Sequence, residues 1–275
     1  MKPLDNKVAL VTGAGRGIGR AIALKLADAG ASVVVNDLDA DPARETVDLI
    51  TAEGGRAVAC PGNVTAEDFP ERFVATAQEN YGGIDIVVNN AGFTWDNVIQ
   101  RMTDEQWDAI LDLHLKAPFR ILRAVQPVIS AAAKSEAETG IVRCRKVVNI
   151  SSIAGTGGNA GQVNYSAAKA GLLGLTKTLS KEWGRYNVTV NAVAYGLIQT
   201  RLTESTADAD ATIEVDGRTL KVGINPELRA TMEHSIPLGR AGTVDDAAGA
   251  VYLLCLPESD YISGQTVICA GGFTV

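Results

Sequence analysis

Three side chains in the middle of the chain have the types and spacing that proton transfer requires. Tyr165 and Lys169 stand four residues apart in an Ala- and Leu-rich run, and Ser152 precedes the tyrosine by thirteen residues. Such a run favours a helix, in which residues four apart share one face. A phenol has an unperturbed pKa of about 10, and a neighbouring ammonium lowers it by stabilising the phenolate. Bringing the pKa of the phenol to about 7 requires about 4 kcal/mol of differential stabilisation.

The pair is therefore a candidate acid/base device, and the Ser152 hydroxyl could hold a substrate oxygen beside it. The alternative is a packed tyrosine next to a solvated lysine, because Tyr-x-x-x-Lys also arises by chance in helices. The motifs elsewhere in the chain favour the catalytic interpretation.

A glycine-rich segment, T-G-A-G-R-G-I-G at residues 12–19, follows the first apolar run. Its glycines allow a sharp turn and a close approach to a pyrophosphate, and the helix expected next offers amides and the positive end of its dipole. The spacing Gly13-x3-Gly17-x-Gly19 differs from the common G-x-G-x-x-G pattern. A purely structural turn is the alternative. The position between a first strand and a first helix favours a dinucleotide cofactor.

Asp37 ends the second apolar run, eighteen residues after Gly19. A carboxylate there can accept hydrogen bonds from both ribose hydroxyls of an adenosine, and it would repel a 2′-phosphate. Arg16 argues mildly the other way, because a guanidinium can pair with such a phosphate. The repulsion is the larger effect, so we expect a preference for NAD(H), with NADP(H) as the alternative cofactor. A second interpretation of Asp37 is that it only caps the next helix.

Composition limits the kind of protein this is. The 275 residues are enough for one large domain, and 46% hydrophobic and 21% charged residues are typical of soluble globular proteins. A net charge of −7 argues against nucleic acid or an acidic membrane as a partner. Four scattered cysteines and two histidines indicate neither a metal site nor a disulfide framework. There is no recognisable signal peptide and no apolar run of membrane-spanning length, so we expect a cytoplasmic protein.

Short apolar runs alternate with longer amphipathic ones, which argues for a parallel sheet covered by helices on both faces. The expected strands are residues 8–12, 32–36, 57–60, 84–89, 146–150, 189–193 and 266–270. The expected helices include residues 16–29, 42–53, 66–80 and 104–133. No linker or internal repeat divides the chain, so we expect a single catalytic domain over residues 1–275.

Residues 201–237 interrupt this alternation. They contain I-E-V-D-G-R-T-L-K-V, in which an Asp-Gly pair between two β-prone runs is a strong signal for a hairpin. Long loops in compact domains are often functional, so this excursion could cover the mouth of a substrate pocket. The alternative is a surface decoration without catalytic consequence.

Together these motifs resemble the short-chain dehydrogenase/reductase family. Residues 12–19 match its T-G-x-x-x-G-x-G cofactor turn, N-N-A-G at residues 89–92 is similar to its motif after the fourth strand, and Ser152, Tyr165 and Lys169 fall at its catalytic spacing. Ser151 is the adjacent alternative to Ser152, but thirteen residues is the family spacing. The resemblance covers residues 8–272, nearly the whole chain.

Within the family, the segment after N-N-A-G, the G-Q-V-N-Y-S-A-A-K stretch and the ending Y-I-S-G-Q-T-V are similar to 3-oxoacyl-(acyl-carrier-protein) reductases. The chain also resembles 3-hydroxyacyl-CoA dehydrogenase domains of multifunctional proteins. The resemblance implies an α/β Rossmann-type doubly wound parallel sheet of seven strands in the order 3-2-1-4-5-6-7, with helices on both faces. It also implies a homotetramer with contacts through residues 104–133, 164–184 and 266–270.

The resemblance implies the following site. Ser152, Tyr165 and Lys169 would be catalytic, and His114 would be a candidate for the proton path. The residues expected at the cofactor are Gly13, Gly15, Arg16, Gly17, Ile18, Gly19, Asp37, Asn63, Val64, Asn90, Ala91, Gly92, Tyr165, Lys169, Gly196, Ile198 and Thr200. No metal is expected.

The chain departs from the family pattern at four positions. His114 stands where an asparagine frequently anchors a water beneath the lysine, so we expect an altered relay, although His114 could be a packing residue only. Tyr195 replaces the usual proline before Gly196, and Asn63 stands where an aspartate often meets the adenine. Asp37 departs from the common NADPH preference of the biosynthetic reductases.

We therefore predict reversible hydride transfer between NAD(H) and a secondary alcohol/ketone pair, on a small-molecule substrate with a CH-OH or carbonyl group. A 3-oxoacyl/3-hydroxyacyl thioester is the favoured substrate. A steroid, a terpenol or a small diol is the alternative within the family. A catalytically silent binding protein on the same fold is the remaining hypothesis, since a fold alone does not imply activity.

Overall fold

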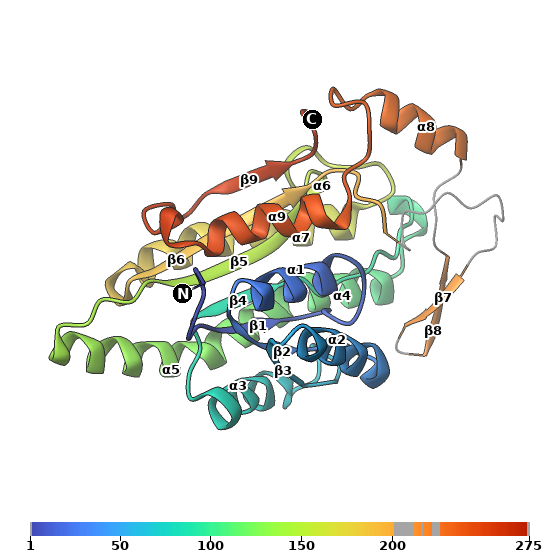
Figure 1. The fold of residues 1–275 in the computed structure, drawn as a ribbon. Coiled ribbons are helices and arrows are strands. Elements are labelled where there is room, and N and C mark those ends of the chain that lie inside the picture. Colours follow the sequence, from blue (N-terminus) through green and yellow to red (C-terminus); the bar gives the residue numbers. More distant parts are fainter. Residues whose placement is uncertain (1, 201–211, 216, 222–225, 274–275) are drawn as a thin grey trace.

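The computed structural model describes residues 2–200, 212–215, 217–221 and 226–273. Its centre is a seven-stranded sheet in the order β3-β2-β1-β4-β5-β6-β9, and neighbouring strands run parallel (Figure 1). The predicted strand order is confirmed, with β9 as the seventh strand. The strands are β1 (Val8–Val11), β2 (Ser32–Val35), β3 (Arg56–Ala59), β4 (Ile86–Asn89), β5 (Arg145–Ser152), β6 (Val188–Tyr195) and β9 (Thr266–Cys269).

The central strands consist mainly of apolar residues, many of them β-branched, because both faces of the sheet are covered. Alternate residues of one strand enter different cores: Ala9 and Val11 of β1 belong to one apolar cluster, and Val8 and Leu10 to the other. The predicted two-sided architecture is confirmed by these two cores.

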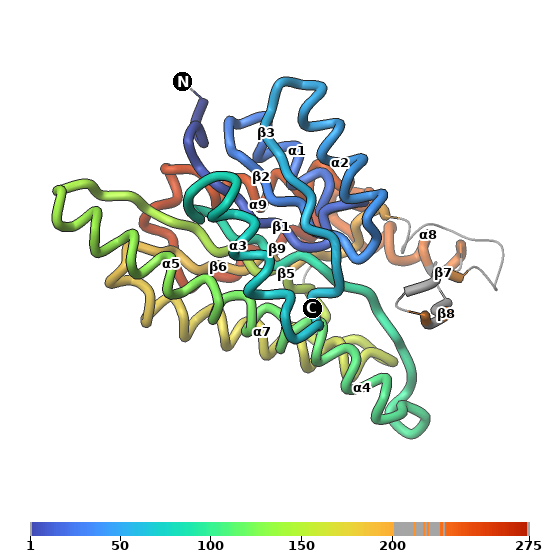
Figure 2. Tube along the Cα trace, turned by 90° about the horizontal axis from the view of Figure 1, so that it is seen from below, coloured from blue at the N-terminus to red at the C-terminus, as the bar shows by residue number. Residues whose placement is uncertain are grey.

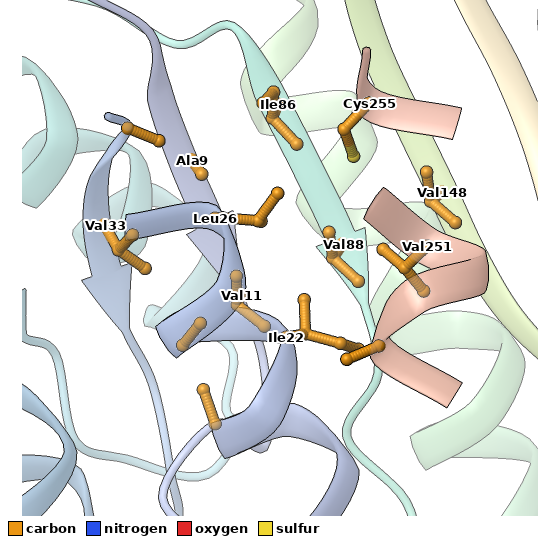
Figure 3. Packing of buried hydrophobic residues seen from close by; sticks show 14 of the residues in the cluster. Ala9, Val11, Ile22, Leu26, Val33, Ile86, Val88, Val148, Val251 and Cys255 are labelled. Carbon is orange, nitrogen blue, oxygen red and sulfur yellow. The ribbon is translucent and has the colours of Figure 1, made fainter. Parts of the chain in front are cut away.

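The first core lies beneath α1 (Gly17–Asp28), α2 (Ala40–Ala52) and α9 (Val244–Cys255). Figure 3 shows Ile22 of α1 and Val251 of α9 packed over Val88 of β4. The second core lies beneath α3 (Phe69–Tyr81), α5 (Ala117–Thr139) and α7 (Val163–Glu182), which share the other face of the sheet (Figure 2).

The long helix expected over residues 104–133 is not one continuous α-helix. It consists of α4 (Asp104–Leu111), a π-helical segment (Asp112–Lys116) and α5. Thr103 and Gln106 form a capping box that starts α4. Pro118 has no N–H to donate to the carbonyl of His114, which disfavours an unbroken α-helical ladder at this point. The π-helical segment places His114 among the buried residues.

Two further strands, β7 (Thr212–Val215) and β8 (Arg218–Lys221), pair antiparallel, and Gly217 between them has φ +73°. They are followed by α8 (Pro226–His234), while the short α6 (Ala154–Gly157) precedes α7. Figures 1 and 2 both place the hairpin and α8 at the end of the molecule where α4 begins. Residues 201–211, 216 and 222–225 of the expected excursion lie outside the described residues. Within the described parts of the chain, no helix is long and apolar enough to cross a membrane.

Candidate active site

Ser152, Tyr165 and Lys169 meet where β5 ends and α7 begins. Ser152 is the last residue of β5, and its Oγ accepts a hydrogen bond from the N–H of Ala154 at 3.2 Å. Tyr165 and Lys169 lie one turn apart near the start of α7, as their spacing predicts. The Ser152 hydroxyl donates to the carbonyl of Tyr195 at 3.5 Å, and the Ser152 side chain is near enough to the Tyr165 phenol to lower its pKa. The two hydroxyls therefore lie close enough to share one substrate oxygen.

Lys169 is buried beneath this pair. Its ammonium donates a hydrogen bond to the carbonyl of Ile150 at 2.6 Å and lies 5.5 Å from the centroid of the Tyr165 ring. A side chain at position 155 would meet the backbone of Lys169 at 2.8 Å, so Gly155 lets α6 pack directly against α7. The lysine is thus held between the sheet and the phenol.

The pKa of the phenol moves in the direction opposite to the one expected from the sequence. Burial raises the pKa of Tyr165 to about 12, and the hydrogen bond with Ser152 opposes this rise only in part. Burial also lowers the pKa of Lys169 to about 7. Desolvation is the first cause of both shifts. Of the two groups, the lysine is the one whose pKa lies near neutral pH.

Ser151 has a different task from its neighbour. Its buried hydroxyl donates to the carbonyl of Lys169 at 3.1 Å and so fastens α7 to β5. This use of Ser151 supports the choice of Ser152 as the substrate-facing hydroxyl.

The glycine turn between β1 and α1 is fixed to the end of β4. The Asn90 amide donates to the carbonyls of Thr12 at 2.9 Å and Gly13 at 3.1 Å, and the Thr12 hydroxyl accepts from the N–H groups of Asn90 and Ala91. A Cβ on Gly19 would lie 2.0 Å from the carbonyl oxygen of Gly13. Position 19 therefore has to be glycine, and the shape of the turn fits the close approach of a dinucleotide pyrophosphate to the start of α1.

Asp37 follows β2 and faces this turn. Its carboxylate accepts hydrogen bonds from the N–H of Gly15 at 2.9 Å and from the N–H of Asp39 at 3.2 Å. The helix-cap interpretation is wrong, because Asp39 is the residue that precedes α2. Arg16 forms an ion pair with Asp39 at 2.8 Å, so the one guanidinium in the turn already faces a carboxylate.

The other residues expected at the cofactor also follow strand ends. Asn63, after β3, accepts hydrogen bonds from the N–H of Thr65 at 2.9 Å and from its hydroxyl at 2.8 Å. Gly196, after β6, donates its N–H to the carbonyl of Cys269 at 3.1 Å, and Ile198 bridges to Gly242. Carboxyl ends of parallel strands form the usual ligand crevice of such sheets. The remaining expected residues lie in the same segments: Gly17 and Ile18 at the start of α1, Val64 after Asn63, Gly92 after Ala91, and Thr200 after Ile198.

His114 contacts the active-site tyrosine from the π-helical segment. Its ring meets the Tyr165 ring edge-on, with centroids 5.0 Å apart and planes at 87°, and its Nε2 lies 2.7 Å from the carbonyl oxygen of Phe93. A Cβ on Gly92 would come within 2.3 Å of the imidazole. The imidazole is hydrogen-bonded to a backbone carbonyl, so this residue does more than fill space.

Tyr195, which replaces the family's proline, contacts α9 with its side chain. Its buried hydroxyl donates to the carbonyl of Ala247 in α9 at 2.8 Å, and its ring joins the first core. Burial raises the pKa of this phenol. Its backbone carbonyl accepts from the N–H of Ile153 at 2.9 Å and thereby supports the loop after Ser152.

Sequence reasoning missed the polar contacts that join the segment after β4 to the start of α7. Gln162 donates to Asp96 at 2.7 Å, and Asn164 donates to the carbonyls of Trp95 at 3.2 Å and Gln106 at 3.0 Å. The charge of Asp96 also raises the pKa of Tyr165. The sequence signal that could have indicated these contacts is the polar Asn164 directly before the tyrosine. Its side chain is buried in the structure.

The chain is similar over almost its whole length to known reductases. A family model described as enoyl-(acyl carrier protein) reductase matches residues 13–274. The 3-oxoacyl-[acyl-carrier-protein] reductase FabG of Vibrio cholerae is 38% identical over 271 residues, which cover 98% of both chains. The 3-oxoacyl-[acyl-carrier-protein] reductase of Synechocystis sp. is 39% identical over 277 residues and 100% of both chains. The corresponding FabG of Thermotoga maritima is 36% identical over 279 residues and 99% of both chains.

The matched residues include the glycine turn, the segment after β4, and the serine, tyrosine and lysine described above. On this sequence similarity and this arrangement, the chain belongs to the short-chain dehydrogenase/reductase family of nicotinamide-dependent oxidoreductases.

Proposed function

We propose that this protein interconverts a secondary alcohol and a ketone with NAD(H), and that a 3-oxoacyl/3-hydroxyacyl thioester is its favoured substrate. The observation that carries the proposal is the grouping of Ser152 and Tyr165 over the buried Lys169, together with a glycine turn shaped for a dinucleotide. A nicotinamide bound there supplies or accepts the hydride.

In the direction of reduction, Ser152 holds the substrate oxygen and stabilises the negative charge that develops on it. Tyr165 donates its phenolic proton to that oxygen, which suits a group that stays protonated at neutral pH. Lys169, when protonated, stabilises the phenolate that remains. In the direction of oxidation the same three groups act in reverse, and Tyr165 takes the proton from the substrate hydroxyl.

The relatives support the thioester class. Each of the three described above is named as a reductase of a 3-oxoacyl group on acyl-carrier protein. The matching family model carries the name of an enoyl reductase, but a serine hydroxyl near the phenol suits a carbonyl oxygen. A steroid, terpenol or small-diol substrate is the alternative, and a silent binding protein is the remaining hypothesis.

The preference for NAD(H) rests on the charges around the glycine turn. Asp37 places a half-buried carboxylate against Gly15, where a 2′-phosphate would be repelled. Arg16, which could attract that phosphate, pairs with Asp39. Arg20, the next cation along α1, pairs with Glu45 at 2.7 Å. The local balance of charge therefore favours a ribose with free hydroxyls.

We also propose a homotetramer in a reducing, cytoplasmic compartment. β9 is an edge strand, and apolar side chains are exposed along it and beside it, including Ile268 at 48% and Leu253 at 64%. Trp107 of α4 and Phe119 of α5 are exposed on a second face. All four cysteines are free thiols, which supports the proposed reducing compartment. Light scattering tests the assembly: Ile268→Lys is expected to lower the molar mass, and an unchanged mass would exclude contact through β9.

A substrate screen tests the proposed reaction. The purified protein is incubated with NADH or NADPH and with acetoacetyl-CoA, a steroid ketone or a small diketone, and cofactor oxidation is followed. We expect the highest kcat/KM with NADH and acetoacetyl-CoA. Higher efficiency with the steroid or the diketone would replace the thioester proposal. No turnover with any ketone would support the binding-protein hypothesis.

A further inference from the structure

We propose that Asp96 determines substrate specificity: its carboxylate, hydrogen-bonded to Gln162, repels ketones that carry a free carboxylate and so selects 3-oxo acids whose carboxyl group is masked as an ester or thioester. The inference rests on the proposed reaction and specifies which form of the acyl group the site accepts. Discrimination between substrates can come from repulsion of the wrong one as well as from attraction of the right one.

Asp96 is fastened to the segment that leads into Tyr165. The Gln162 amide, three residues before the tyrosine, donates to the Asp96 carboxylate at 2.7 Å. Its oxygen accepts a hydrogen bond from the Asn159 amide at 2.9 Å. Because both ends of the Gln162 amide are engaged, its N–H side stays directed at Asp96.

The neighbours of Asp96 are held in the same way. The carbonyl of Trp95 accepts a hydrogen bond from Asn164 at 3.2 Å, and Asn97 forms a β-bridge with Gln162. These contacts join residues 95–97 to the residues directly before the tyrosine of α7. The Asp96 carboxylate therefore keeps a fixed place beside the site.

The charge of Asp96 reaches the proton donor. After burial, this charge contributes to the raised pKa of Tyr165, so the two groups interact. No lysine or arginine among the described residues forms an ion pair with Asp96. Lys169 lies 5.5 Å from the centroid of the Tyr165 ring, but burial lowers its pKa to about 7, so most of its charge is lost at pH 8. An anion bound at the phenol therefore meets the negative charge of Asp96.

The chemistry of a 3-oxo acid brings its carboxylate into this field. One CH₂ group separates the ketone from the carboxyl carbon, so a ketone oxygen held by Tyr165 places the carboxylate close to the phenol. An ester or thioester has no charge at that place. Two like charges about 6 to 10 Å apart change a relative affinity by roughly 2- to 100-fold, for effective dielectrics between 80 and 20.

The test compares acetoacetate with ethyl acetoacetate, which share one ketone, in NADH oxidation at pH 8. Burial raises the pKa of Asp96, but the ordinary value of about 4 leaves a wide margin below pH 8. We expect the wild type to have the higher kcat/KM for the ester. Asp96→Asn keeps an oxygen for the bond from Gln162 and should lower the ester-to-anion ratio of kcat/KM by roughly 5-fold or more. If acetoacetate is not reduced, its inhibition constant against the ester gives the same comparison.

The ratio cancels effects that both substrates share, such as a change in Tyr165. Asp41→Asn controls for net charge, because this carboxylate is 94% exposed and pairs with Arg44, and its ratio should match the wild type. Asp96→Ala removes the contact with Gln162 as well as the charge, and its ratio should fall as in Asp96→Asn.

Three results would overturn the inference: a wild type that prefers acetoacetate, an unchanged ratio in Asp96→Asn, or a fall in Asp96→Ala alone, which would assign the selectivity to shape. Failure of the wild type to reduce either compound would instead count against the proposed reaction, and the inference would fall with it.

Discussion

Replacing Asp37 with asparagine removes one charge beside the glycine turn and one of the two hydrogen bonds that the carboxylate accepts. The variant keeps a side-chain oxygen that can accept the hydrogen bond from Gly15, now 2.9 Å long, and it is nearly the same size. Two unit charges 5 Å apart interact by about 3 kcal/mol at an effective dielectric of 20 and about 1 kcal/mol at 80. Asp37 is half-buried, so the repulsion of a 2′-phosphate falls between these limits. That range corresponds to roughly 5- to 150-fold in relative rate.

The assay is the ratio of kcat/KM for NADPH to kcat/KM for NADH, with one ketone at fixed ionic strength. We expect Asp37→Asn to raise this ratio by about 10-fold or more. Arg16 and Asp39 are 45% and 55% exposed, and an exposed pair contributes at most about 1 kcal/mol. Adding Asp39→Asn to the Asp37→Asn variant should therefore raise the ratio of kcat/KM for NADPH to that for NADH again, because the Arg16 guanidinium is released from its ion pair.

Asp41→Asn is the matched control, because that carboxylate is 94% exposed and pairs with Arg44. Its ratio should equal that of the wild type. If Asp37→Asn leaves the ratio unchanged as well, the electrostatic account of cofactor preference is refuted.

Three further outcomes follow from the geometry. Because the pKa of Lys169 is lowered to about 7, its ammonium is lost as pH rises through 7, so kcat for ketone reduction should fall above pH 7. Gly19→Ala should weaken NADH binding, measured by fluorescence titration, because its Cβ would collide with the Gly13 carbonyl at 2.0 Å. Tyr195→Phe should lower the free energy of unfolding in urea by about 1 kcal/mol, since it deletes the buried hydrogen bond to Ala247.

For each of these three predictions, one result would contradict the physical reason given. A kcat that stays flat from pH 6 to 9 would mean that the charge of Lys169 does not limit the rate. Gly249→Ala, where a Cβ meets nothing within 4 Å, is the control for Gly19, and equal NADH affinities of the two variants would dismiss the steric argument. An unfolding midpoint for Tyr195→Phe equal to the wild type would show that the hydroxyl bond adds no net stability.

The sheet and the placement of the site were predictable from the sequence because they depend on local patterns. Strands buried on both faces have to be apolar throughout, and the helices between them fix a parallel order. Tyr165 and Lys169 fall on one face for reasons of helical spacing alone. Asp37 and the glycine turn come together because both follow neighbouring strands, β2 and β1.

Other features depended on tertiary packing and could not be predicted in this way. At the π-helical segment, Pro118 lacks a backbone N–H and the His114 ring is hydrogen-bonded to the carbonyl of Phe93. The hydrophobic periodicity of the sequence indicates neither feature. The pKa of Tyr165 was predicted in the wrong direction, because its burial depends on segments distant in sequence. The contact between Asp96 and Gln162 joins residues 66 positions apart.

The central claim is that Tyr165 transfers the proton while the bound nicotinamide transfers the hydride. The most direct test is single-turnover reduction of acetoacetyl-CoA by NADH with wild type and Tyr165→Phe, together with NADH affinity by fluorescence. Proton transfer by a positioned side chain is worth roughly 10²- to 10⁴-fold, so the variant should lose at least about 100-fold in rate while its NADH affinity stays within about threefold of the wild type. A variant that binds NADH normally and turns over at a rate near the wild type would contradict the account.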